Sequence, residues 1–524
     1  MNGAEFLISA LEFSGVDTCF ANPGTSEMHF VAALDGSTSM RGILGLFEGV
    51  VTGAADGYGR MLDRPAATLL HLGPGLANAN SSLHNAKRAL SPVVNVVGDH
   101  ARNHLELDAP LTSDVEGAAR PFSNWVRTSS RSEALLSDAA EAVTVALRGN
   151  VSTLVLPADV SWTELEEVPS NWPCVGTVPR PRVDQGSVEA AARALIEAGP
   201  RGLILMGGRT MRAEAVEFAD RIGAATGARV CSDTFLPRVE RGAGRHNVGT
   251  VPYPLALSQE LFSRYDTVVL VGTKPPVAFF AYPNSRSEIS SPGTRFVDLC
   301  PSSPFAHDSL SAVYDALPEK LRHQDHESRR VAMVAEHAVP DRPSGSITRE
   351  KLAAFLGSAI PENSIIVDES ITTGSGFYSA TTGALPHDWL SATGGAIGWA
   401  LPVATGAAIA CPERKVVCLE SDGSGAYMPQ ALWTQAREGS DVVTLIFANQ
   451  RYQILRDEMA NVGVSKIGER AANLLDIGSP SIDWVAVARG FGVAARRVET
   501  MDDLGKAFDQ AISTSGPALI EVLV

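Results

Sequence analysis

The sequence lacks the features of a disulfide-bonded, zinc-binding or membrane-spanning protein. Its 524 residues contain six cysteines but no Cys-x-x-Cys pair, which suits a reducing compartment and argues against a disulfide framework or a zinc site. No apolar run reaches the roughly 20 residues that a bilayer requires. The N-terminal stretch MNGAEFLISALEFSG has no basic segment and predicts a first helix rather than a signal peptide. We therefore expect a cytoplasmic protein.

Positive charge is also scarce. The chain has 43 lysines and arginines against 59 aspartates and glutamates, which gives a formal net charge of −16. This balance argues against a nucleic-acid backbone or an anionic membrane as the partner and leaves a small molecule as the expected ligand. Hydrophobic residues make up 45% of the chain, which is enough for packed cores, and the length suggests two to four domains.

Two stretches rich in proline and polar residues divide the chain. They cover residues 166–186 and 322–346, and such clusters mark domain connections. Between them, short β-branched runs alternate with alanine-rich amphipathic segments. This alternation predicts an α/β fold with three consecutive doubly wound parallel-sheet domains. We place these domains at residues 1–165, 185–330 and 345–524.

One predicted buried strand, KVVCLE, ends in the turn Ser-Asp-Gly-Ser-Gly, which contains Asp422. The next strand ends at Asn449, which lies 449 − 422 = 27 residues later, so a βαβ unit would bring both side chains to one sheet edge. Carboxylate and amide oxygens suit Mg²⁺, and Gly423, Ser424 and Gly425 would open a helix whose amides favour an anion. The alternative is that Asp422 only caps the helix and Asn449 only begins a turn.

These residues resemble the signature of the thiamine diphosphate-dependent enzymes, in which Gly-Asp-Gly precedes a strand that ends in Asn-Asn. This chain has Ser421-Asp422-Gly423 and Ala448-Asn449, so both departures flank the expected ligands and leave them in place. The resemblance implies that Mg²⁺ is bound by the side chains of Asp422 and Asn449 and by the main-chain carbonyl of Arg451.

The stretch GLFEGVVTGAADGYGR resembles the helix of this family that carries the cofactor-activating glutamate, here Glu48. Its carboxylate would hydrogen-bond the aminopyrimidine ring and so favour the tautomer that removes the thiazolium proton. The alternative is a solvated helix glutamate. The stretch TGGAIGWALP resembles a third family segment, in which Gly395 offers a carbonyl to the aminopyrimidine and Ile397 holds the cofactor bent. Ile397 could equally be an ordinary core residue.

Taken in order, these matches resemble the decarboxylase and acetolactate synthase branch of the family. The resemblance implies a pyrimidine-binding, a central and a diphosphate-binding domain, with the cofactor between two subunits of a homodimer or homotetramer. The central domain resembles the one that holds FAD in acetolactate synthases, but LMGGRT and LVGTKPP lack Gly-x-Gly-x-x-Gly, so FAD has little support. The residues assigned to thiamine diphosphate are Glu48, Thr373, Gly395, Ile397, Gly423, Ser424 and Tyr452.

The substrate pocket is most similar to that of benzoylformate decarboxylase. The stretches FANPGTSEMHF and LLHLGPGLANANSS place Thr25 where that enzyme binds the substrate carboxylate and His71 where it transfers a proton. Alternatively, Thr25 caps a helix and His71 is an ordinary hydrogen-bonded histidine. Phe279 or Phe280 replaces a second histidine, and His100 is a candidate for the missing proton relay.

The segment QRYQILRDEM is expected to close on the site, with Leu455 against the substrate beside Phe279 and Phe280. This apolar wall suits an aromatic or branched 2-oxo acid. We therefore expect a thiamine diphosphate-dependent decarboxylase. Carboligation is expected as well, because phenylalanine cannot relay a proton and the intermediate can then react with a second carbonyl compound. Three alternatives stay open, namely an acetolactate synthase-like carboligase, a flavin-linked oxidase and a non-catalytic homologue that binds the cofactor.

Overall fold

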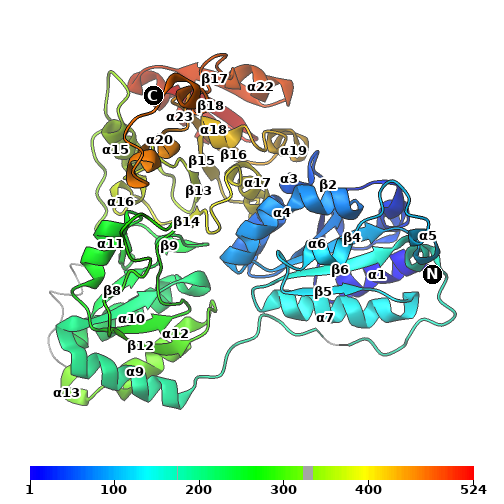
Figure 1. The fold of residues 1–524 in the computed structure, drawn as a ribbon, viewed down its shortest axis with the longest axis horizontal. Helices are drawn as coiled ribbons and strands as arrows, with labels where there is room; N and C mark the ends of the chain where they lie inside the picture. The colour runs from blue at the N-terminus through cyan, green and yellow to red at the C-terminus, as the bar shows by residue number, and fades with distance from the viewer. Residues whose placement is uncertain (174, 323–333) are drawn as a thin grey trace.

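The computed structural model describes residues 1–173, 175–322 and 334–524, which form three α/β bodies (Figure 1). Each body is built on its own, largely parallel, sheet. The predicted α/β fold with three consecutive sheets is therefore confirmed. The end of the central domain that we predicted at residue 330 lies outside the described residues, and the domain boundaries stay predictions. No helix among the described residues is long and apolar enough to cross a membrane.

The first sheet has six parallel strands in the order β2-β1-β3-β4-β6-β5. Helices cover both of its faces, so its central strands β3, β4 and β6 are buried along their whole length. Its strands are β1 (Thr18–Asn22), β2 (Arg41–Leu44), β3 (Ala66–Leu70), β4 (Val93–Asp99), β5 (Trp125–Thr128) and β6 (Val151–Pro157). Its helices are α1 (Gly3–Phe13), α2 (Met28–Ala33), α3 (Glu48–Leu62), α4 (Leu72–Ala89), α5 (Arg102–Leu105), α6 (Val115–Ala119), α7 (Leu135–Leu147) and α8 (Ala158–Trp162).

The central sheet has five parallel strands in the order β10-β8-β7-β11-β12. They are β7 (Gly202–Met206), β8 (Arg229–Ser232), β10 (Gly249–Thr250), β11 (Thr267–Val271) and β12 (Arg295–Cys300). The helices of this body are α9 (Gln185–Ala198), α10 (Ala213–Thr226), α11 (Leu255–Phe262), α12 (Ala306–Ala316) and α13 (Glu319–Arg322).

The third sheet has the order β17-β18-β16-β15-β13-β14-β9. Its parallel strands are β13 (Ile365–Glu369), β14 (His387–Ser391), β15 (Val416–Ser421), β16 (Val442–Ala448), β17 (Ala494–Val498) and β18 (Ala518–Leu523). The edge strand β9 (Val239–Arg241) comes from the central part of the chain and pairs antiparallel with β14. The helices are α15 (Arg349–Ala359), α16 (Phe377–Ala380), α17 (Ala400–Ala410), α18 (Asp422–Gly425), α19 (Ala431–Glu438), α20 (Gln453–Asn461), α21 (Glu469–Asn473), α22 (Trp484–Gly490) and α23 (Met501–Ser513).

Helix α3 of the first body packs directly on helix α17 of the third (Figure 1). Glycines make this approach close, because a Cβ atom at Gly57 would lie 2.1 Å from the carbonyl oxygen of Val403. A Cβ atom at Gly406 would lie 1.8 Å from the carbonyl oxygen of Ala54. Only glycine fits at these contacts, so the first and third bodies form one tightly packed unit within a single chain.

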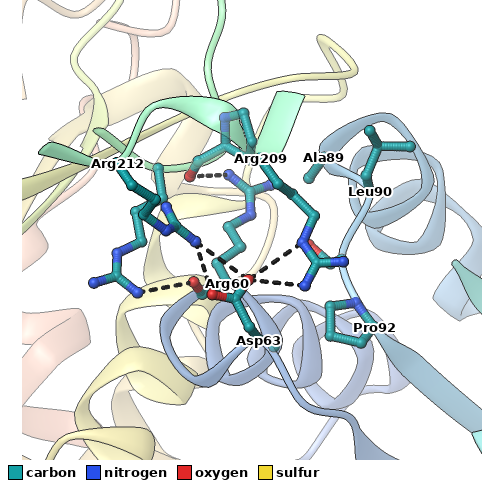
Figure 2. A pocket seen from close by; sticks show the side chains of 11 residues that line it. Arg60, Asp63, Ala89, Leu90, Pro92, Arg209 and Arg212 are labelled. Atoms are coloured by element: carbon teal, nitrogen blue, oxygen red, sulfur yellow. Dashed lines mark hydrogen bonds and ion pairs between the residues drawn. The ribbon is translucent and has the colours of Figure 1, made fainter. Parts of the chain in front are cut away.

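The three bodies meet around the last turn of α3, where Figure 2 shows arginines of the central body converging on Asp63. Arg209 donates a hydrogen bond of 2.9 Å to Oδ1 of Asp63, and Arg212 donates one of 3.0 Å to Oδ2. Arg60 of the same turn donates to the carbonyl of Ser391 in the third body at 2.8 Å. Burial raises the pKa of Asp63, but Arg212 and Arg209 outweigh this effect and hold the pKa below its usual value.

Candidate active site

The four residues predicted to be catalytic follow four neighbouring strands of the first sheet. The strand register pairs Ala21 with Leu44, Asn22 with Leu70, and Leu70 with Val97, so these strands end together. Ligands bind at such carboxyl edges of parallel sheets. The residues that follow β2, β1, β3 and β4 are respectively Glu48, Thr25, His71 and His100.

Glu48 and His71 both lie beside Gly75. A Cβ atom at Gly75 would lie 3.1 Å from Oε1 of Glu48 and 3.4 Å from Cβ of His71. The other carboxylate oxygen, Oε2 of Glu48, accepts a hydrogen bond of 3.0 Å from Asn78. Glu48 begins α3 and is only 7% exposed. A solvated helix glutamate, the alternative for this residue, is therefore excluded.

A second glutamate, Glu27, holds the His71 ring, and the sequence analysis did not single it out. Nδ1 of His71 lies 2.8 Å from Oε2 of Glu27, which also accepts the main-chain N–H of Gly24 at 2.7 Å. Glu27 is 1% exposed, and burial raises its pKa although Gly24 and His71 both oppose this effect. His71 itself is half-exposed. No described hydrogen bond uses its Nε2 atom. The signal that could have found Glu27 was its position two residues after Thr25 in the same motif.

Thr25 and His100 occupy the neighbouring strand ends. Thr25 begins a 3₁₀ turn (Thr25–Glu27) and is exposed, and the cap position of that turn is Gly24. The alternative role of Thr25 as a helix cap is therefore wrong. The Nε2 atom of His100 is buried and has no hydrogen-bond partner among the described residues. The His100 ring lies 5.1 Å from the ring of His104.

The predicted metal ligands meet at the carboxyl edge of the third sheet. Oδ1 of Asp422 accepts the N–H of Gly423 at 2.9 Å, and Oδ2 accepts the N–H of Gln450 at 2.6 Å. The side-chain oxygen of Asn449 accepts the N–H of Arg451 at 3.0 Å. The βαβ unit thus joins Asp422 to the turn at residues 449–451. Gln450 takes a left-handed conformation, with a φ angle of 57°, which turns its N–H toward Asp422.

The turn after β15 differs from the prediction. Gly423, Ser424 and Gly425 open a separate single turn, α18, and the longer helix α19 begins only at Ala431. Pro429 lies between the two and lacks the N–H that a continuous helix needs there. The N-cap of α18 is Ser421, and no side chain caps it, so the alternative that Asp422 only caps this helix is wrong.

The residues of this edge fit Mg²⁺ and a diphosphate. The hydroxyl of Ser424 is buried and has no hydrogen-bond partner among the described residues. The ring of Tyr452 packs over the same turn, since a Cβ atom at Gly423 would lie 2.7 Å from it. Burial raises the pKa of Asp422 to about 6, against the opposing effect of its main-chain donors. A carboxylate, an amide oxygen and a carbonyl are ligands that Mg²⁺ prefers. Thr373 is buried shortly after the neighbouring strand β13.

The segment with Gly395 and Ile397 is held by Glu369, which the sequence analysis also missed. Glu369 ends β13, is buried, and accepts the N–H of Gly398 at 2.9 Å and that of Ala400 at 3.0 Å. Burial raises the pKa of Glu369, although the main-chain donors oppose this. Ile397 is half-buried and belongs to none of the core clusters among the described residues. An ordinary core role for it is therefore excluded.

Phe279, one of the predicted substrate-pocket residues, lies beside this segment. A Cβ atom at Gly395 would lie 2.5 Å from the ring of Phe279, so the ring is in contact with Gly395. Phe279 and Phe280 are 45% and 52% exposed, and their ring centroids are 4.9 Å apart. Leu455 is exposed on α20, the helix that we expected to close on the site. The structure thus brings an aromatic pair to a predicted cofactor-binding residue.

Comparison with known proteins identifies the family to which this site belongs. The N-terminal TPP binding domain of thiamine pyrophosphate enzymes matches residues 1–118, and the C-terminal TPP binding domain matches residues 374–522. A Mycobacterium tuberculosis protein provisionally named acetolactate synthase large subunit IlvX is 45% identical over 100% of this chain and 99% of its own. Benzoylformate decarboxylase from Pseudomonas aeruginosa is 27% identical over 97% of this chain and 96% of its own.

A solved structure has the same fold. The thiamine diphosphate-dependent 4-hydroxybenzoylformate decarboxylase of Rhodococcus jostii RHA1 superposes with a TM-score of 0.80 at 23% identity. The superposition covers 100% of this chain and 99% of that one. At this identity, the similarity shows the three-sheet architecture alone.

Proposed function

Because the chain belongs to the thiamine pyrophosphate (thiamine diphosphate) enzyme family, we propose that it decarboxylates an aromatic or branched 2-oxo acid with bound thiamine diphosphate and Mg²⁺. The observation that carries this proposal is the placement of Glu48 and His71 beside Gly75, with His71 held by Glu27. The benzoylformate decarboxylase relative supports an aromatic substrate. The exposed rings of Phe279 and Phe280 beside Gly395 support it as well.

The residues divide the work as follows. Asp422, Asn449 and the carbonyl of Arg451 hold Mg²⁺, while Ser424 and Tyr452 bind the diphosphate end. The cofactor supplies a carbon nucleophile and an electron sink for the loss of carbon dioxide.

At the reacting end, Glu48 would bind the aminopyrimidine ring of the cofactor and hold a proton at its carboxylate. Thr25 donates a hydrogen bond to the substrate carboxylate. His71 delivers a proton from Nε2 while Glu27 keeps the ring oriented through Nδ1.

Carboligation is a second outcome of the same site. The IlvX relative supports an acetolactate synthase-like reaction. In such a reaction, the carbon that has lost carbon dioxide bonds to a second carbonyl compound and is not protonated. Phenylalanines stand where a second proton-relaying histidine is expected. We expect Phe279→His or Phe280→His to shift products toward free aldehyde by about tenfold or more. An unchanged ratio of aldehyde to hydroxyketone in both variants would show that these rings only shape the pocket.

The proposed function does not require FAD. A dinucleotide would need to approach the glycines at the carboxyl edge of the central sheet. A Cβ atom at Gly207 would lie 2.0 Å from Asp233, and one at Gly208 would lie 2.3 Å from Ser302, so these two glycines are in contact with the chain's own side chains. Flavin absorbance in the purified protein would favour the flavin-linked oxidase instead.

We propose that two chains build each site. Within one chain, Glu48 contacts Asn78 of α4, whereas the cofactor segment contacts Asn85 of α4 through the carbonyl of Ala396 at 2.7 Å. These positions on α4 lie about 10 Å apart along the helix axis, so Glu48 and the Gly395 segment contact different turns of α4.

Mixing two inactive variants, Glu48→Gln and Asp422→Ala, tests this assembly. Hybrid dimers would regain one intact site, which gives about a quarter of the wild-type activity in an equimolar mixture after subunit exchange. No recovery, despite hybrid formation shown by differently tagged chains, would place each site within one chain.

A panel of 2-oxo acids tests the function itself. With thiamine diphosphate and Mg²⁺, we expect benzoylformate or a branched 2-oxo acid to release carbon dioxide, and both aldehyde and hydroxyketone products are measured. A protein that binds the cofactor but turns over no 2-oxo acid would be the non-catalytic homologue.

A further inference from the structure

We propose that Glu458, Tyr253 and Tyr282 form the polar end of the substrate pocket and select aromatic 2-oxo acids that carry a hydroxyl group far from the reacting carbon. This inference rests on the proposed function, since it names the substrate class of the same site. The three residues are called the Glu458 cluster below.

The Glu458 cluster joins two parts of the chain that are far apart in sequence. The hydroxyl of Tyr282 donates to Oε2 of Glu458 at 2.9 Å, and the hydroxyl of Tyr253 donates to Oε1 at 3.3 Å. Both tyrosines follow strands of the central sheet, whereas Glu458 lies on α20 of the third body. Leu455, the predicted substrate contact, lies one turn earlier on α20 and thus on the same helix face.

A continuous aromatic wall connects the cluster to the cofactor segment. Phe279 contacts Gly395, and the ring of Tyr253 lies 5.8 Å from the ring of Phe279. Phe235 lies 5.7 Å from Phe279 and 6.0 Å from Tyr253, which completes a three-ring group. An aromatic substrate bound beside Phe279 would therefore point its far end toward the phenol of Tyr253 and the carboxylate of Glu458.

The cluster offers hydrogen-bond acceptors and no free donor. A carboxylate only accepts, and each tyrosine already donates its one hydrogen to Glu458. Burial, reinforced by Glu458, raises the pKa of both tyrosines, so they stay protonated in this arrangement. Each carboxylate oxygen of Glu458 keeps a lone pair that the two tyrosines do not use. A hydroxyl on the substrate would donate a further hydrogen bond to the cluster, whereas an unsubstituted ring offers no donor.

The wall suits a planar aromatic substrate. Phe235 packs edge to face on Tyr253 and on Phe279, the rings of Tyr253 and Phe279 are tilted to each other, and a planar ring packs well in such surroundings. Sites that hydrogen-bond a substrate hydroxyl reject the analogue without it by large factors. Because Glu458 and Tyr282 are half-exposed, we expect a smaller preference, of about tenfold or more in kcat/KM.

The test compares 4-hydroxybenzoylformate with benzoylformate in the cofactor-loaded, full-length enzyme. The wild type should prefer the hydroxylated compound by about tenfold or more. Glu458→Gln and Tyr282→Phe should reduce this preference toward one, because kcat/KM should fall further for the hydroxylated compound than for benzoylformate, mainly through KM. The matched control is Asp457→Asn, which changes the neighbouring exposed carboxylate of α20 and should keep the preference.

Three results would overturn the inference. The first is a wild-type preference near one, and the second is a wild type that prefers a 2-oxo acid with a distal guanidinium group. The third is an equal loss for both substrates in Glu458→Gln, which would mean that the cluster only ties α20 to the central body. Benzoylformate turnover in these three cases would leave the proposed function intact. Failure of every 2-oxo acid, with the cofactor bound, would refute the proposed function and this inference together.

Discussion

Nδ1 of His71 lies 2.8 Å from the buried carboxylate of Glu27, so one nitrogen of this histidine is bound by the protein, and no described hydrogen bond uses the other. The same carboxylate binds the N–H of Gly24 at 2.7 Å, which joins the ends of β1 and β3. A buried carboxylate that orients a histidine fixes both its ring plane and its tautomer. The proton that His71 moves is therefore expected at Nε2.

Replacing Glu27 should impair proton transfer more than cofactor binding. We expect Glu27→Gln to lower kcat by about ten- to a hundredfold, because the amide holds the ring less well and no longer stabilises its protonated form. Thiamine diphosphate affinity should stay within about threefold, since Glu27 contacts no predicted cofactor residue. The double variant with His71→Ala should be no slower than His71→Ala alone. An additive loss would mean that Glu27 acts independently of His71.

Glu48→Gln should retain the cofactor but fail to activate it. A neutral amide cannot drive the aminopyrimidine tautomer, so hydrogen–deuterium exchange at the reactive carbon of bound thiamine diphosphate should slow by about a hundredfold or more. Quenched-flow exchange followed by NMR measures this rate. Exchange at the wild-type rate would remove Glu48 from the activating role, whatever happened to turnover.

Asp422→Ala should abolish retention of Mg²⁺ and thiamine diphosphate. The side chain is buried against the turn of Gln450, and no other carboxylate lies at the predicted ligand positions. Calorimetric titration with the cofactor and Mg²⁺ measures the loss, and circular dichroism checks that the fold is kept. Asp509→Asn, at an exposed position of α23, is the control and should bind normally. Wild-type affinity in Asp422→Ala would disprove the metal assignment.

Glu369→Gln should loosen the segment that carries Gly395 and Ile397. An amide has one acceptor fewer, which leaves a buried main-chain N–H unpaired at a cost of about 1–3 kcal/mol. We expect the thiamine diphosphate dissociation constant to rise by about tenfold, with a smaller change in kcat at saturating cofactor. Glu362→Gln, an exposed position before the same strand, should change neither. Equal losses in kcat and affinity would instead indicate general unfolding of this edge.

Asp63→Asn should destabilise the junction of the three bodies. It leaves Arg209 and Arg212 without their carboxylate, which we expect to cost about 3 kcal/mol and to lower the thermal midpoint. The pKa of Asp63 is held below its ordinary value of 3.8, so its stabilising effect is complete above that pH and is lost as pH falls through the lowered folded-state pKa.

The difference in thermal midpoint between wild type and Asp63→Asn should therefore be constant near neutral pH and shrink only below about pH 4. Scanning calorimetry across pH measures it. Glu260→Gln, which removes an exposed ion pair with Arg264, is the control and should change stability by at most about 0.5 kcal/mol. A difference that shrank already near pH 6 would contradict the lowered pKa.

The sequence by itself determined the three sheets and the positions of most candidate site residues. Buried parallel strands appear as short β-branched runs and ligands bind beyond their ends, so the pattern alone predicted Asp422 and Asn449 as site residues. Glu48 and His71 were predicted from the resemblance to the thiamine diphosphate-dependent family. The helix after Asp422 was the exception. There, Pro429 divides the segment into a single turn and a later helix.

The tertiary structure alone decided which side chains support these residues. Glu27 is 44 positions from His71, Glu369 is 29 from Gly398, and Glu458 is 205 from Tyr253. The three-residue strand β9 joins a sheet whose other strands lie more than a hundred residues later in the chain. Sequence periodicity reports which face of an element is buried. It carries no signal for a polar contact between distant elements, because such a contact depends on how the packed bodies bring two chain segments together.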